Sequence, residues 1–126
     1  MNRKELEAYI AEIYDTYPEY LWADTPNCAV FRHSNNRKWF ALVVDIPKEK
    51  LGLTNEGMID ILNVKGEPVM IDFLKNETGF FPAYHMNKTN WITVALDGSV
   101  PSEKVKMLLD ISFDLTAQKI KKRRKQ

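Results

Sequence analysis

Cysteine, glycine and long apolar runs are scarce in this 126-residue chain, and each scarcity excludes a class of protein. Its single cysteine, Cys28, has no partner for an internal disulfide or for a zinc site built on paired cysteines. The apolar run from Phe40 to Val44 is far shorter than the roughly twenty residues that span a bilayer. Five scattered glycines form no phosphate-binding loop. We therefore expect a cytoplasmic protein without membrane insertion.

Catalytic side chains are equally scarce. His33 and His85 are the only two histidines, so neither a histidine cluster nor a nucleophile–base triad has support in the sequence. Cys28 lies in an apolar run, where an inert buried thiol is commoner than a nucleophile. The acids of the first predicted helix suit a solvated helix face better than a metal site. We expect a non-enzymatic protein with no cofactor and no bound metal. Acidic residues and the lack of an apolar stretch near Met1 predict that there is no signal peptide.

Positive charge is concentrated at the C-terminus. Residues 119–126 hold six of the eighteen cations, which leaves twelve cations against seventeen anions, a net charge of −5, in the rest of the chain. Such a basic tail can complement the dipole of a preceding helix, or it can contact nucleic acid or an anionic membrane surface. The acidic body is unusual for a duplex-binding domain, which is normally basic overall.

Residue spacing predicts the first half of the fold. Apolar residues at intervals of three and four predict an amphipathic helix over residues 3–17, and Pro18 ends it. Two runs rich in apolar and aromatic residues, 28–32 and 38–46, predict strands, and the polar turn between them makes a hairpin. Residues 58–64 predict a third strand, with its side chains on alternating faces.

The second half of the chain adds two helices and two strands. Pro68 suits the first turn of a short helix. Residues 80–84 predict an edge strand because Pro82 cannot donate to a central ladder, and residues 91–96 predict another strand. Ser102 is the expected N-cap of a closing helix. The order α-β-β-β-α-β-β-α predicts one two-layer α+β domain over 1–126, an antiparallel five-stranded sheet covered by helices.

The core should combine both kinds of element. We expect Trp39 or Phe40 and Leu42 or Val43 to join the interior with residues from the last strand and last helix. Those further core residues are Ile92, Val94, Leu108, Leu109 and Leu115.

Several short motifs carry a family resemblance over nearly the whole chain. They are Lys38-Trp39-Phe40-Ala41-Leu42, Asn63-Val64-Lys65, Pro82-Ala83-Tyr84-His85-Met86-Asn87-Lys88, Trp91, Leu96-Asp97-Gly98 and Ser112-Phe113-Asp114-Leu115-Thr116. In order and spacing they resemble the MmcQ/YjbR family of small bacterial proteins. The resemblance implies a secretion-chaperone-like or frataxin-like fold and a double-wing surface that binds DNA. Phe113 departs from the family, which often has tyrosine there.

The segment Tyr84 to Trp91 is the first candidate site. His85, Asn87 and Lys88 can present donors to phosphate oxygens or base edges, and Trp91 offers a face for stacking. The alternative is that the aromatic residues anchor the core while residues 87–90 only turn the chain.

The hairpin tip is the second candidate site. Arg32, Arg37 and Lys38 can act as a wing against a phosphate backbone, and Lys65 can join the same surface. The alternative is an ordinary solvated hairpin.

Three functions follow from these sites. The first hypothesis is a DNA-binding module of low sequence selectivity, and we expect it to be a monomer. The second is a protein-interaction or chaperone-like adaptor that uses an exposed sheet face or groove. The third is a small-molecule pocket near Tyr84, His85 and Trp91. A continuous positive face joining the hairpin tip to Lys88 would favour nucleic acid.

Overall fold

The structure, a computed structural model, describes residues 1–117 and confirms the predicted α+β fold and element order. A short 3₁₀ helix, η1 (Lys48–Leu51), occupies part of the loop expected after the second strand. The remaining elements are α1 (Arg3–Tyr14), β1 (Ala29–Arg32), β2 (Trp39–Pro47), β3 (Met58–Lys65), α2 (Pro68–Leu74), β4 (Phe80–Pro82), β5 (Trp91–Ala95) and α3 (Ser102–Thr116). The basic tail and Ile120 lie outside the described residues.

The five strands form one antiparallel sheet in the order β1-β2-β3-β5-β4. Strands β2 and β3 have the longest pairing, which runs from Ala41 opposite Val64 to Pro47 opposite Met58. Strand β4 lies at the edge, as Pro82 predicted.

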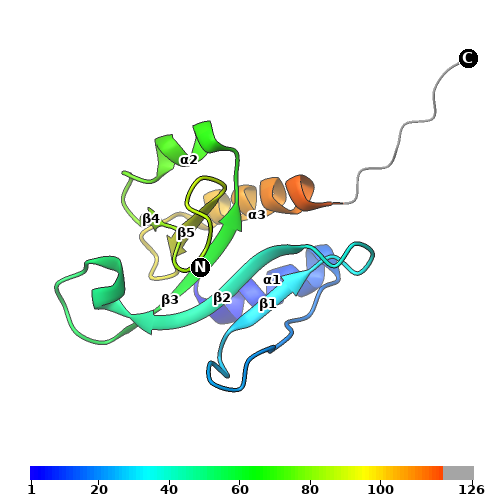
Figure 1. Ribbon diagram of the computed structural model, residues 1–126, viewed down its shortest axis with the longest axis horizontal. Coiled ribbons are helices and arrows are strands. Elements are labelled where there is room, and N and C mark those ends of the chain that lie inside the picture. Colours follow the sequence, from blue (N-terminus) through cyan, green and yellow to red (C-terminus); the bar gives the residue numbers. More distant parts are fainter. Residues whose placement is uncertain (118–126) are drawn as a thin grey trace, which may run out of the picture.

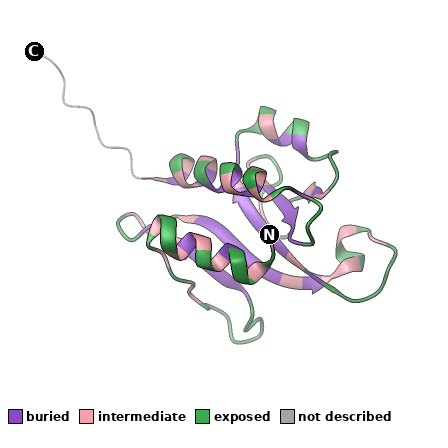
Figure 2. Ribbon diagram, turned by 180° about the vertical axis from the view of Figure 1, so that it is seen from behind, coloured by how far each residue is buried: buried purple, intermediate pink, exposed green. Residues whose placement is uncertain are grey.

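Helices α1 and α3 cover one face of the sheet. They lie behind it in Figure 1 and in front of it when the molecule is turned round in Figure 2. The core between these layers includes Phe40, Val43 and Leu109, all fully buried. Ile92, Val94 and Leu108 join it as predicted.

Leu115 is the exception in the predicted core. It is only half-buried and lies outside the core cluster. The buried stripe of α3 is centred on Val105, Leu108, Leu109, Ser112 and Thr116. At 100° per residue, position 115 falls on the flank of that stripe, so the prediction for this residue was wrong.

Two helix boundaries also differ from prediction. Helix α1 ends at Tyr14 because Asp15 adopts a left-handed conformation with φ of 49°. Tyr17 is therefore outside the helix and is 66% exposed. Ser102 is not the N-cap of α3, since Pro101 holds that position without a side-chain hydrogen bond. The spacing of apolar residues does not predict the backbone conformation of single residues at a helix end.

Within residues 1–117, no α-helix covers the other face of the sheet, which is turned toward the viewer in Figure 1. Its apolar side chains alternate with those of the helix-covered face, so that Ile59 and Ile61 point here while Leu62 and Val64 point to the helices. Leu51 of η1 and Leu53 of the loop that follows cover part of it. Among residues 1–117, no helix is long and apolar enough to cross a membrane.

Candidate functional site

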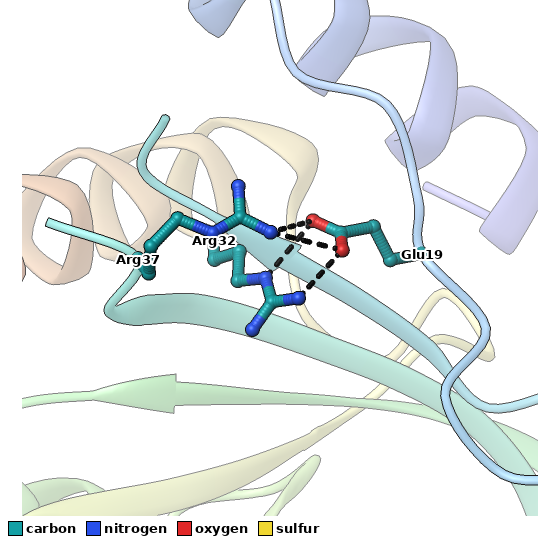
Figure 3. Close-up of polar contacts among 3 residues, drawn as sticks. All are labelled: Glu19, Arg32 and Arg37. Atoms are coloured by element: carbon teal, nitrogen blue, oxygen red, sulfur yellow. Dashed lines mark hydrogen bonds and ion pairs between the residues drawn. The ribbon is translucent and has the colours of Figure 1, made fainter. Parts of the chain in front are cut away.

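The two arginines of the hairpin share one carboxylate. Arg32 donates from Nε and Nη2 to Glu19 at 3.0 and 2.7 Å, and Arg37 Nη2 lies 3.2 Å from the same group (Figure 3). The hydrogen bond and charge of Arg32 hold the pKa of Glu19 below its ordinary value. These two cations are thus already paired within the chain.

Glu19 is positioned by the connection between α1 and β1. Its backbone exchanges two hydrogen bonds of 2.9 Å with Val30, which fixes the connection along the edge of the sheet. The carboxylate reaches Arg32 from there, and the turn brings in Arg37, whose φ is 64°.

The rest of the hairpin tip is joined to the end of α3. His33 is buried, and its Nε2 lies 2.9 Å from Thr116 Oγ1. Asn36 donates to the Thr116 carbonyl at 2.9 Å, and its Oδ1 accepts from the backbone of Lys38. Burial lowers the pKa of His33. Arg37 and Lys38 are both exposed, but Arg37 pairs with Glu19, and the turn itself serves as a structural junction.

The connection between β4 and β5 is a hydrogen-bonded turn. Asn87 Oδ1 accepts from the backbone amides of Thr89 and Asn90, and its carbonyl accepts from Trp91. Lys88 is exposed and donates from Nζ to the Ala83 carbonyl at 2.9 Å. Asn87 therefore has a turn-forming role, whatever else it contacts.

Lys65 and Trp91 lie opposite each other in the β3–β5 ladder. Both are half-buried, and the backbone amide of Lys65 donates to Ser112 Oγ on α3 at 2.9 Å. Neither of them lines the hairpin cavity, which is formed by Arg32, Arg37 and their neighbours. The predicted site residues thus divide between separate parts of the molecule.

His85 lies at a groove that is separate from the hairpin cavity. Its ring stacks on that of Tyr84, with centroids 4.0 Å apart, and its backbone adopts a left-handed φ of 55°. Both side chains line an apolar groove of about 620 Å³ on the helix-free face, which we call the sheet-face groove. The volume lies within the range of ligand and side-chain pockets.

Three elements form the sheet-face groove. The α1–β1 connection supplies Trp22, strand β2 supplies the floor through Leu42 and Val44, and the β4–β5 connection supplies Tyr84 and Met86. Trp39 completes the wall, and the ring of Trp22 meets it edge-on at 5.7 Å. The large apolar side chains of the groove therefore come mainly from two loops and from β2.

A buried polar pair holds one wall in place. Thr93 Oγ1 donates to Asn63 Oδ1 at 2.5 Å and accepts from the backbone amide of Tyr84 at 2.8 Å. Asn63 Nδ2 donates to the Tyr84 carbonyl at 3.0 Å. Asn63 and Thr93 are fully buried, so these bonds tie the wall to the centre of the sheet.

Asp24 and Asp45 also line the groove, and its lining within residues 1–117 includes no lysine or arginine. Asp45 alternates with Leu42 and Val44 along β2, so its side chain points to the helix-covered face of the sheet. Cys28 lines the groove as well, and burial raises the pKa of this thiol. A raised pKa disfavours the thiolate, which is the reactive form. Within residues 1–117, no three His, Cys, Asp or Glu side chains converge as a metal site would require.

Comparison with known proteins identifies the family of this chain. Residues 5–115 match the YjbR family. The protein belongs to the YjbR family. An uncharacterized Bacillus subtilis protein, YyaQ, is 40% identical over 92% of this chain and 98% of its own. The uncharacterized YjbR of Escherichia coli K12 is 34% identical over 41% of this chain and 45% of its own.

Solved structures share the fold. A crystal structure of a Pseudomonas syringae protein has a TM-score of 0.91 and 43% identity, covering 93% of this chain and all of its own. A Deinococcus radiodurans protein has a TM-score of 0.68 at 24% identity, covering 90% of this chain and 77% of its own, a likeness that extends to the fold alone.

Sequence reasoning missed most of the groove. The sequence predicts a small-molecule pocket near Tyr84, His85 and Trp91, but Trp91 does not line the groove, and the sequence assigns Trp22 and Trp39 to no site. A signal was present, since Tyr20, Leu21 and Trp22 form an apolar run inside a segment otherwise typical of turns. Such a run outside a regular element favours surface contact over core packing.

Proposed function

We propose that this protein is a non-catalytic interaction module that holds a short segment of a partner protein in the sheet-face groove. The observation that carries the proposal is the groove itself, an aromatic-walled hollow on a sheet face without an α-helix. Apolar surface that the fold leaves partly open is typical of sites where another molecule completes the packing.

The exposed side chains around Trp22 favour a macromolecular partner over a small ligand. Trp22 is 39% exposed, and the adjoining Leu21 and Tyr20 are 41% and 54% exposed. Tryptophan and tyrosine are enriched among residues that dominate protein–protein binding energies. The connection therefore offers contacts beyond the volume of the groove, which a small ligand would not use.

DNA binding draws less support from the geometry. Glu19 pairs with both Arg32 and Arg37, which reduces the charge of this cluster from +2 to +1, and the chain before the tail carries a net charge of −5. Lys38 and Lys88 stay available for phosphate, but two exposed lysines on separate loops are common on any protein surface.

The test is a selection of random dodecapeptides on the full-length protein, followed by NMR titration of the three tryptophan indole N–H signals. Peptides that dock in the groove should shift Trp22 and Trp39, whereas Trp91, outside the groove, serves as an internal control. Trp22→Ala should weaken binding at least tenfold, about 1.4 kcal/mol, the scale of an interface anchor. Phe73→Ala, on exposed α2, should leave affinity unchanged.

Three results would overturn the proposal. The library could yield no peptide, or the selected peptides could leave both groove tryptophans unshifted. The third concerns N-phenyl-1-naphthylamine, a small uncharged probe: if it shifts those signals and no peptide does, the groove takes a small molecule instead of a protein segment.

A further inference from the structure

A second hollow adjoins the sheet-face groove on the same side of the sheet. It has a volume of about 310 Å³ and shares Tyr84 and His85 with the groove, so this stacked pair of rings borders both. Its apolar lining includes Leu51 and Phe81, which pack against the cluster on the helix-free face. A segment that lies in the groove can therefore continue past the stacked rings into this second hollow, which we call the lysine hollow.

Two lysines from different elements line the lysine hollow. Lys50 comes from η1 and Lys88 from the β4–β5 connection, and both are exposed. The ammonium of Lys88 lies at the wall of the hollow, because Nζ donates at 2.9 Å to the carbonyl of Ala83, another lining residue. Since an ammonium has three donors, this bond leaves donors for a ligand. Within residues 1–117, the lining contains neither aspartate nor glutamate.

The hairpin arginines and these two lysines differ in their counter-charges. Glu19 pairs with Arg32 and Arg37. In the described part of the chain, by contrast, no carboxylate lies within ion-pair distance of Lys50 or Lys88. A partner carboxylate at the hairpin has to compete with Glu19, whereas at the lysine hollow it meets two cations without a competitor. A basic partner residue meets like charge there, which is unfavourable.

Resting on the docking function above, we propose that the partner segment carries an aspartate or glutamate within about four residues of its apolar anchor, a span of roughly 13 Å in extended chain. The anchor lies on the floor of the sheet-face groove, formed by Leu42 and Val44. The acidic side chain lies beyond the stacked rings in the lysine hollow, where it pairs with Lys50 and Lys88.

Matched peptides give the first test. In a selected dodecapeptide that shifts Trp22 and Trp39, the acidic residue is changed to glutamine and to lysine. We expect about fivefold weaker binding with glutamine, the scale of a solvent-exposed ion pair, and a further loss with lysine. The acidic form should also shift the backbone amides of Leu51 and Phe81 more than the glutamine form does. Selected peptides without an acidic residue near the anchor would overturn the proposal.

Variants of the two lysines give the second test. In Lys50→Gln/Lys88→Gln, the acidic and glutamine peptides should bind within about twofold of each other, because the ion pairs are gone. In Lys50→Glu/Lys88→Glu, the lysine peptide should bind more tightly than the acidic one, a reversal that distortion of the turn alone does not produce. Both variants keep the basic residues 119–126, so attraction of acidic peptides to the tail does not explain either result.

A charge-matched control separates local recognition from the field of the whole protein. Lys4→Gln/Lys75→Gln removes two exposed lysines that line neither hollow, and it should preserve the preference for the acidic peptide. Loss of the preference in this control would overturn the proposal.

The remaining outcomes separate this proposal from the docking function. If acidic, glutamine and lysine peptides bind equally while Trp22→Ala still weakens binding, the charge proposal fails and the docking function stands. If oligothymidylate shifts the amides of Leu51 and Phe81 and no acidic peptide does, the lysine hollow binds nucleic acid and the charge proposal fails. If no peptide reaches the groove, both fail.

Discussion

Both faces of the sheet carry apolar side chains, but α-helices cover only one of the two faces within residues 1–117. The face under α1 and α3 buries Phe40, Val43 and Leu109 completely. The other face, with Leu42 and Val44, is covered by loops and partly open at the groove. Because a β-strand points alternate side chains to opposite faces, β2 serves both surfaces at once. The helices cover and stabilise one face, and the other stays partly open at the groove.

The largest effect should come from the covered face. Leu109→Ala removes a fully buried side chain from the contact between α3 and the sheet, and we expect a loss of about 2–5 kcal/mol in unfolding free energy. Chemical denaturation measures it. The matched control is Leu21→Ala, where a 41% exposed leucine should cost less than about 0.5 kcal/mol. Equal losses would contradict the distinction between the faces.

The polar support of the groove wall should have an intermediate effect. Thr93→Val keeps the shape of the side chain but removes the partner of Asn63 Oδ1 and of the Tyr84 amide. Leaving buried polar groups unpaired should cost about 1–3 kcal/mol. Hydrogen exchange at the Tyr84 amide should become faster, whereas exchange in α1 should change only with global stability. An unprotected Tyr84 amide in the wild type would contradict this assignment.

The hairpin junction predicts a smaller, pH-dependent effect. Burial lowers the pKa of His33 in the folded state below its unfolded value of about 6.5. The unfolded chain then binds more protons, so this residue's contribution is complete above pH 6.5 and is lost as the pH falls toward the folded pKa. Unfolding free energies measured at pH 7 and pH 5.5 should differ less in His33→Asn than in the wild type. An unchanged difference would exclude His33 as the cause.

The smallest effect concerns nucleic acid. Glu19→Gln releases Arg32 and Arg37 from their shared carboxylate. In a chain that ends at Ala117, this variant should steepen the log–log dependence of DNA affinity on salt by up to about two units, near 0.9 for each phosphate contacted. The same truncated chain with Glu19 intact should bind weakly. If it binds DNA as strongly as the variant, Glu19 does not restrain the arginines.

Much of the fold could be predicted from residue spacing. Alternation in residues 58–64 correctly divided Ile59 and Ile61 from Leu62 and Val64, and Pro82 correctly marked an edge strand. The end of α1 could not be predicted, because it depends on Asp15 adopting a left-handed conformation. Leu115 was misplaced because a residue on the flank of an apolar stripe is buried only if a neighbouring element reaches it.

The candidate sites were harder to predict than the fold. Arg32, Arg37 and Lys38 are close in sequence, which predicted a cationic tip, but the partner of the arginines is Glu19, from outside the hairpin. Charge clusters in a sequence give no information about a counter-charge brought in by another element. The groove combines residues from three distant segments, so only His85 and Tyr84 could be associated with a pocket beforehand.

By itself, the sequence determined which residues form helices and strands and which side of each strand is apolar, because those properties depend on neighbours one to four positions away. Only the tertiary structure decided that α1 and α3 cover the same face of the sheet, that Glu19 reaches Arg32, and that Trp22 and Tyr84 line one groove. These outcomes depend on contacts between residues far apart in the chain, whose geometry is set by the packing of whole elements.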